Sequence, residues 1–164
     1  MGKTIILNLS DIKFNGDILD VGENYGIIYS ISKDAIDEIA VTVANGEELA
    51  TCEEEKFDTC TMFFSLSNMW RDSARYRLIK DVSQYIKKGG ELYIWDINKE
   101  VGSIFNNKVM TMLPSKEIKE FQFKNLNPIS KSNAEETIEM LNEEYTIVEN
   151  KSWEDIYFIK AHRN

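Results

Sequence analysis

The sequence predicts an α/β fold with three layers, α/β/α, in which helices cover a doubly wound, mainly parallel sheet that has an antiparallel C-terminal strand. Short apolar runs typical of buried strands alternate with helical patterns along most of the 164 residues, and this alternation indicates right-handed crossovers between parallel strands. The last two strand-like runs, Tyr145–Glu149 and Ile156–Ala161, have no helix between them. They indicate a hairpin that closes the sheet.

The first half of the chain alternates between strand and helix patterns. Lys3–Leu9 is an apolar stretch that is either an extra strand or a lead-in segment. Asp17–Val21 is the first parallel strand, and Gly26–Asp37 is a helix because its apolar residues recur at helical spacing. Glu38–Ala44 alternates like a strand, and Gly46–Glu55 is a short acidic turn or helix.

The second half continues the alternation. Phe57–Leu66 is almost entirely apolar, as a central strand buried on both faces should be. Asp72–Lys88 has the pattern of an amphipathic helix, which the pair Gly89-Gly90 is predicted to end. Glu91–Ile97 is the next strand, and Ala134–Glu144 is the last helix.

Composition predicts one domain over residues 1–164. The formal net charge of −9 argues against partners that require a basic surface, namely nucleic acids and anionic membranes. No apolar run approaches the roughly 20 residues that span a bilayer. Cys52 and Cys60 are too few for a disulfide scaffold or a zinc site, so we expect reduced thiols and a cytoplasmic location.

The most informative stretch is Asp20-Val21-Gly22-Glu23-Asn24-Tyr25-Gly26, where a buried strand ends in a glycine turn and a helix begins. Glycine allows the backbone amides of such a turn to approach a nucleotide or nucleoside closely. The stretch resembles the first motif of class I S-adenosylmethionine-dependent methyltransferases. A plain strand-to-helix turn without a ligand is the alternative, because short glycine motifs are weak evidence.

Other segments resemble that family in the expected order. Ala44–Leu49 is similar to the segment that holds the adenine, and Phe57–Leu66 to the fourth-strand motif beside the methionine portion of the cofactor. Asp81–Asp96 resembles the helix, glycine turn and fifth strand, and Ala134–Ala161 the last helix and terminal hairpin. The resemblance covers roughly residues 15–162 and implies a Rossmann-like methyltransferase fold.

The resemblance also implies a cofactor, S-adenosylmethionine, and a set of residues around it. Methyl transfer requires alignment and exclusion of water rather than a nucleophile or a metal, so no catalytic residue and no metal ligand is assigned. Asp20 would orient the cofactor's amino group or, alternatively, cap the turn amides, and core packing is the alternative role of Phe64. The residues assigned to the cofactor are Asp20, Gly22, Asn24, Gly26, Asn45, Gly46, Phe64 and Ser65.

The acceptor pocket is expected at Leu66–Arg71 and at Asn98–Ser130, the most variable region of the family. Tyr25, Trp70 and Arg71 are candidates for its lining, although an exposed Trp-Arg pair equally marks a protein contact. His162, the only histidine, is expected at the surface.

The sequence also departs from the family. Between Gly26 and Phe57 there is room for fewer strand-helix units than usual, so the sheet is predicted to lack one strand on the side of Glu38–Ala44. That strand lacks the acid that holds the ribose hydroxyls in the family, and Asn45 stands where an aspartate is usual. These departures predict that cofactor binding is weak or lost.

Two functions from different classes follow. The first is a methyltransferase that acts on an unidentified small molecule. The second is a catalytically inactive methyltransferase homologue that serves as a binding or protein-interaction module. The sequence names no acceptor and leaves the oligomeric state open, a homo-oligomer included.

We predict that S-adenosylmethionine and its analogues bind with a dissociation constant above roughly 100 μM. Each missing charge-assisted hydrogen bond costs about 1.5–3 kcal/mol of binding free energy. Isothermal titration calorimetry measures this constant directly, and a sub-micromolar value would contradict the prediction.

Overall fold

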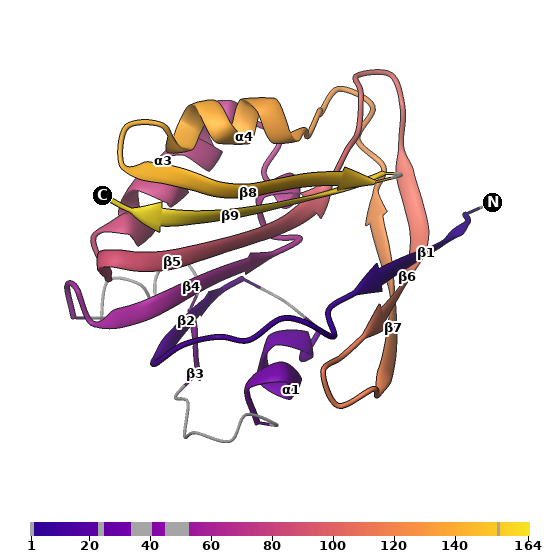
Figure 1. The fold of residues 1–164 in the computed structure, drawn as a ribbon. Coiled ribbons are helices and arrows are strands. Elements are labelled where there is room, and N and C mark those ends of the chain that lie inside the picture. Colours follow the sequence, from indigo (N-terminus) through magenta and orange to yellow (C-terminus); the bar gives the residue numbers. More distant parts are fainter. Residues whose placement is uncertain (1, 23–24, 34–40, 45–52, 154) are drawn as a thin grey trace.

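The computed structural model describes residues 2–22, 25–33, 41–44, 53–153 and 155–164. Within these residues the main sheet has six strands in the order β3-β2-β4-β5-β9-β8 (Figure 1). Strands β2 to β5 run parallel, and β9 is antiparallel to both of its neighbours. The strands are β2 (Ile18–Val21), β3 (Val41–Ala44), β4 (Phe57–Phe63), β5 (Ile86–Ile97), β8 (Tyr145–Trp153) and β9 (Ile156–Arg163).

This sheet confirms the predicted class of fold. Strands β2 and β4 are adjacent in its interior, and β3 is the edge strand on the side where a strand was predicted to be missing. The C-terminal hairpin supplies the antiparallel strand, as its sequence indicates.

A second sheet of three strands stands beside the first, in the order β1-β6-β7. It consists of β1 (Thr4–Asn8), β6 (Phe105–Met112) and β7 (Ile118–Asn125). Strand β1 is parallel to β6, whereas β6 and β7 form an antiparallel hairpin. The N-terminal apolar stretch is therefore a strand outside the main sheet, and the segment expected to hold the acceptor contains the hairpin.

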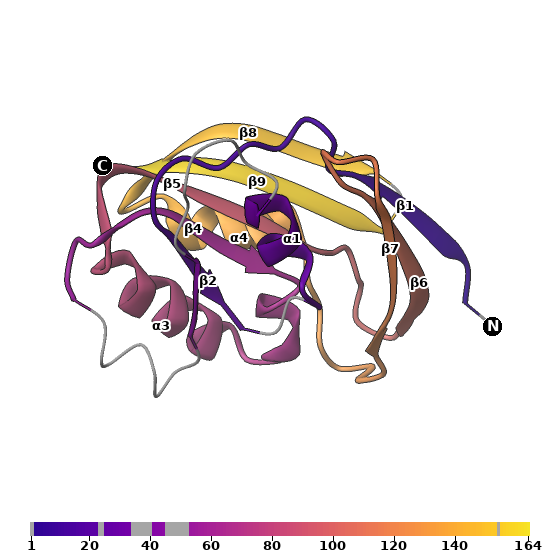
Figure 2. The same ribbon diagram turned by 90° about the horizontal axis from the view of Figure 1, so that it is seen from below.

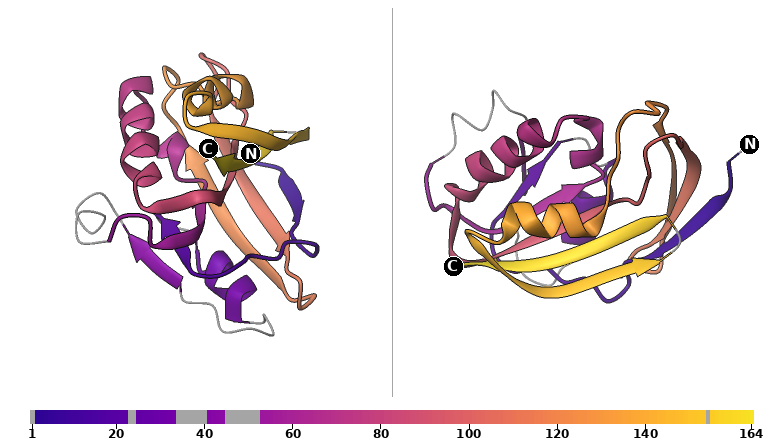
Figure 3. Two further views of the ribbon diagram at one scale, coloured as in Figure 1. Left: turned by 60° about the vertical axis from the view of Figure 1, so that its left-hand side comes forward. Right: turned by 90° about the horizontal axis from the view of Figure 1, so that it is seen from above.

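The helices and the second sheet complete the layers. Helices α3 (Asp72–Ser83) and α4 (Ala134–Leu141) lie on one face of the main sheet, as seen in Figures 1 and 3. Helix α1 (Ile27–Lys33) lies on the other face, which Figure 2 shows from below. The three-stranded sheet stands at the end of the main sheet, beyond β4 and β5, and shares a core with α1. A short 3₁₀ helix, η1 (Leu66–Asn68), follows β4.

Alternation along the strands sorts the apolar side chains into two cores. In β4, Cys60 and Met62 belong to the core under α3 and α4, whereas Phe63 belongs to the core shared with α1 and the second sheet. In β5, Ile94 and Trp95 divide in the same way. Both faces are buried over Thr59–Phe63 of β4 and Leu92–Ile97 of β5, which explains the mainly apolar sequence there.

The glycine pair after α3 has a different role from the predicted one. Helix α3 ends at Ser83, and Gly89 and Gly90 lie inside β5. The pairing of β4 with β5 jumps from Phe57↔Ile86 to Thr59↔Glu91, so the glycines belong to a bulge. The positive φ of 79° at Gly89 suits such a bulge and disfavours residues with a Cβ.

Two of the elements predicted from the sequence lie partly in segments that the structure does not describe. Helix α1 is described as far as Lys33, and most of the acidic stretch Gly46–Glu55 lies outside the described residues. Among the described helices, none has the length and apolar composition needed to cross a membrane.

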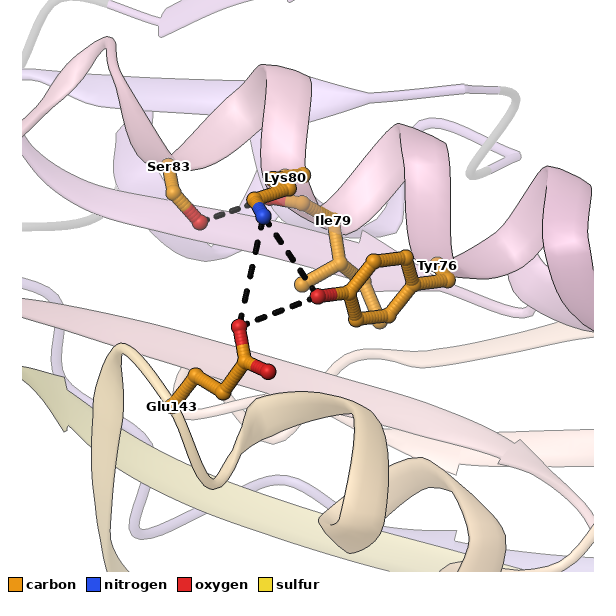
Figure 4. Close-up of polar contacts among 5 residues, drawn as sticks. All are labelled: Tyr76, Ile79, Lys80, Ser83 and Glu143. Carbon is orange, nitrogen blue, oxygen red and sulfur yellow. Dashed lines mark hydrogen bonds and ion pairs between the residues drawn. The ribbon is translucent and has the colours of Figure 1, made fainter.

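Partly exposed polar side chains link the two helices on the same face of the sheet (Figure 4). The hydroxyl of Tyr76 on α3 donates a hydrogen bond to Glu143 Oε2, which follows α4, at 3.0 Å. The Lys80 ammonium lies 3.5 Å from the same hydroxyl and 4.0 Å from the carboxylate. Below them Ile79 is 3% exposed and packs in the core.

We expect the buried contact to dominate the stability of this helix layer. Ile79→Ala should lower the free energy of unfolding by about 2–5 kcal/mol through lost apolar burial and a cavity. Tyr76→Phe should lower it by less than about 0.5 kcal/mol, because ion pairs and hydrogen bonds at the surface are weak. Urea unfolding of the two variants measures both values, and a larger loss for Tyr76→Phe would contradict this ranking.

Candidate functional site

The order of the strands identifies the position of a site. Strand β2 has β3, the next strand in sequence, on one side and β4 on the other. The connections therefore diverge between β2 and β4, and ligands of open α/β sheets bind at such a point, beyond the carboxyl ends of the strands. The turn Gly22–Gly26 follows β2 there, and Phe64 and Ser65 follow β4. The structure thus brings together the two main segments that the sequence assigned to the cofactor.

Asp20 is a fully buried acid at the end of β2. Its Oδ1 accepts a hydrogen bond of 2.8 Å from the hydroxyl of Thr61, the residue beside it in β4. Its Oδ2 is buried and has no hydrogen-bond partner among the described residues. Burial raises the pKa of Asp20 to about 7, although the Thr61 hydrogen bond opposes this shift. Asp20 therefore changes charge near neutral pH and retains one oxygen that can accept a further hydrogen bond.

The two described glycines of the turn share a positive φ but differ in the space available for a side chain. Both have a positive φ, 88° at Gly22 and 76° at Gly26, which favours a residue without a Cβ. A Cβ at Gly22 would lie 2.7 Å from Ser65 Oγ. A Cβ at Gly26 would meet no described atom within 4 Å. Gly22 therefore permits close contact between the two walls of the site, whereas no described atom would crowd a Cβ at Gly26.

Ser65 connects these walls. Its hydroxyl donates a hydrogen bond of 2.7 Å to the carbonyl oxygen of Val21, at the end of β2. The side chain is 5% exposed, so the bond is shielded from water. It fixes the segment after β4 against the glycine turn.

Phe64 has a backbone conformation that is rare for its residue type. Its φ is 57°, in the left-handed region, and its amide donates a 2.7 Å hydrogen bond to Trp95 O. Such a conformation costs roughly 1–3 kcal/mol and persists where the surroundings enforce it. The ring is fully buried against Phe63 and against Phe121 and Phe123 of β7. Phe64 thus contributes to core packing at the edge of the site.

The hairpin of the second sheet contacts the glycine turn through an aromatic pair. Tyr25, in the glycine turn, stacks on Phe121 with ring centroids 4.3 Å apart and an interplanar angle of 13°. Phe121 also contacts Phe63. In Figure 1 the hairpin stands across the carboxyl ends of β4 and β5. Sequence reasoning missed Phe121 and Phe123, although the alternation in Glu120-Phe121-Gln122-Phe123-Lys124 is a strand signal.

The two segments predicted to hold the acceptor meet where β7 ends. Asn125, the last residue of β7, donates a side-chain hydrogen bond of 3.0 Å to Ser67 O in η1. Trp70 is 52% exposed, and the Arg71 guanidinium lies 4.9 Å from its ring centroid. The structure therefore joins the segment after β4 to the hairpin and leaves the Trp-Arg pair near the surface.

Three residues that the sequence assigned to the cofactor are not described, and the only histidine lies away from the site. Asn24, Asn45 and Gly46 lie outside the described residues. His162 is 45% exposed, and its Nε2 lies 3.8 Å from Glu91 Oε1, so it is a surface residue as predicted. Within the described part of the chain, no group of acidic, histidine and cysteine side chains is arranged to hold a metal ion.

Comparisons with known proteins identify the family and the fold. The model of the ubiE/COQ5 methyltransferase family matches residues 2–127. No curated protein matches the sequence significantly.

Three solved structures illustrate the similarity of fold. A SAM-dependent methyltransferase from Methanosarcina mazei is 16% identical, with a TM-score of 0.54, and the match covers 93% of this chain and 94% of that chain. One from Mesorhizobium loti is 11% identical, with a TM-score of 0.58 and the same coverages, 93% and 94%. The N-methyltransferase NodS from Bradyrhizobium japonicum WM9 is 13% identical, with a TM-score of 0.57, and the match covers 90% and 85%.

The two turn glycines provide a matched test of the contact between the walls. Gly26→Ala should lower the free energy of unfolding by roughly 1–2 kcal/mol, because it places a Cβ at positive φ. Gly22→Ala should lower the free energy of unfolding by about 1–3 kcal/mol more than Gly26→Ala does, because its Cβ also crowds Ser65. Thermal and urea unfolding measure the difference. Equal losses of unfolding free energy in the two variants would show that the close approach of Ser65 to Gly22 does not affect stability.

Proposed function

Because this chain belongs to the ubiE/COQ5 methyltransferase family, we propose that it transfers a methyl group from S-adenosylmethionine to a small-molecule acceptor. The observation that carries the proposal is the convergence of the buried Asp20 and the glycine turn with the Phe64–Ser65 segment at the divergence point between β2 and β4. The acceptor itself is not identified.

The residues at this position fit the cofactor, which is S-adenosylmethionine. The unpartnered Oδ2 of Asp20 can accept a hydrogen bond from the ammonium group of the cofactor's methionine portion. The positive φ of Gly22 and of Gly26 suits a turn whose backbone can approach a ligand closely, because neither residue carries a Cβ. We propose that the turn Gly22–Gly26 holds the methionine and ribose portions, and that Asn45-Gly46 faces the adenine.

The bound cofactor supplies a methyl group on a sulfonium, which reacts by direct displacement. The protein has to align the two reactants and exclude water. Buried Ser65 fixes the segment after β4 against the glycine turn, and Tyr25 of that turn stacks on Phe121. The net charge of −9 disfavours a nucleic acid as the acceptor, and we propose a small molecule instead. The scarcity of cysteine, two in 164 residues, further supports a cytoplasmic location.

Binding of S-adenosylmethionine and S-adenosylhomocysteine tests the proposal. At millimolar ligand we expect both to raise the unfolding temperature, because a ligand that binds the native state stabilises it. Adenosine and methionine, added separately at the same concentrations, serve as controls and should produce smaller shifts. No shift and no heat of binding at millimolar ligand would overturn the proposal and favour the inactive interaction module.

The charge of Asp20 predicts the pH dependence of this binding. The ionised carboxylate attracts the cofactor's ammonium group, and a pKa of about 7 means that Asp20 becomes protonated as the pH falls below 7. Lowering the pH from 7.5 to 6.0 should therefore raise the dissociation constant roughly fivefold to tenfold. Calorimetric titrations at the two pH values measure this change.

Asp20→Asn should bind the cofactor about tenfold more weakly at pH 7.5 and lose the pH dependence, because the amide carries no charge. Asp58→Asn is the matched control. Asp58 lies at the other end of β4, where its Oδ1 pairs with Lys87 at 2.9 Å. This control should bind like the unmodified protein, and a similar loss in both variants would remove Asp20 from the site.

A further inference from the structure

Strand β1 has a free edge whose backbone groups point away from the protein. Lys108 donates its amide hydrogen to Lys3 O, and Leu9 donates its own to Met112 O. The odd-numbered residues of β1 thus direct their backbone toward β6, so those of Thr4, Ile6 and Asn8 face the opposite side. Strand β1 is the last strand of its sheet among the described residues.

This edge lacks the charges and the bulge found at two of the other described edges, those of β7 and β8. Strand β8 carries Glu149 and Lys151 and has a bulge near Ile147, and β7 carries both acidic and basic residues. Charges and bulges of this kind prevent edges from pairing with other chains. Thr4–Asn8 contains no charge and no proline, although 29% of the whole chain is charged. The neighbouring Lys3 ammonium is paired with Asp155 at 2.9 Å.

The outer face of the strand is apolar at its centre. Ile6 is 62% exposed and lies beside Met110 of β6 in the sheet. On the same face Met112 is 37% exposed and lies opposite Ile118, which is 53% exposed. An exposed apolar patch on an unprotected edge indicates an interaction surface.

We propose that the free edge of β1 pairs antiparallel with β1 of a second copy of this chain, forming a two-fold symmetric dimer with a continuous six-stranded sheet. The sequence of the edge is self-complementary about Ile6. In this register Ile6 lies next to Ile6 of the partner subunit, and Thr4 pairs with Asn8 of the partner subunit. No charge meets a like charge, and residues opposite one another exchange paired hydrogen bonds, about six in all. A two-fold contact uses both edges and stops at a dimer.

Sedimentation velocity of the full chain between about 2 and 200 μM tests this proposal, with a dissociation constant of roughly 1–100 μM expected. The mass should rise from 19.0 kDa toward twice that value. A mass that stays at that of the monomer across this range would overturn the proposal.

Two variants test the edge itself. Ile6→Pro removes an outward-facing amide without touching the bonds to β6, and Ile6→Lys adds a charge at an exposed position. Each should weaken dimerisation at least about tenfold with an unchanged circular dichroism spectrum. Gln122→Lys, on the exposed face of β7, is the control and should dimerise normally. A dimer that persists in both Ile6 variants would locate the interface elsewhere.

Hydrogen exchange provides an independent readout. The amides of Ile6 and Asn8 should exchange slowly in concentrated solution and rapidly in dilute solution, whereas those of Ile5 and Leu7 should be protected in both. Rapid exchange at Ile6 in a solution shown to be dimeric would overturn the proposed pairing.

Discussion

The burial of both faces of the central strands is the constraint on which the rest of this structure depends. Successive side chains of β4 and β5 point to opposite faces, and both faces are buried over Thr59–Phe63 and Leu92–Ile97. Each face therefore needs its own cover. Helices α3 and α4 supply one cover, and α1 together with the three-stranded sheet supplies the other.

The second cover supplies the aromatic residues that border the candidate site. In this chain an aromatic hairpin shares a core with α1, and the same core contains Phe63 and Phe64 of the segment that borders the site. The rings of Phe121 and Phe123 therefore stabilise the fold and hold Phe64, which borders the site, at the same time. A change in the hairpin would alter the stability of the fold and the position of this segment together.

Two side-chain hydrogen bonds, made by Ser65 and Asp20, characterise the described part of the candidate site. The bond from Ser65 to Val21 O holds two segments that are far apart in sequence, and Gly22 makes room for it. Burial raises the pKa of Asp20 toward neutrality, and the Thr61 hydroxyl, its one side-chain donor among the described residues, opposes this shift. Burying a carboxyl group with one partner is unfavourable unless a ligand completes its hydrogen bonds, which is the physical basis for assigning Asp20 to the cofactor.

The sequence by itself determined the order of the strands and helices of the described main sheet and the glycine turn after β2, because these depend on local periodicity and on glycine at particular positions. It did not predict β6 and β7, which lie in the segment assigned to the acceptor. Only the tertiary structure placed Phe121 on Tyr25 and Ser65 against Gly22, since these contacts join segments that no local pattern relates. The same reason explains the misassigned Gly89-Gly90 pair. A glycine pair ends a helix or forms a bulge equally well, and the pairing of β4 with β5 decided between them.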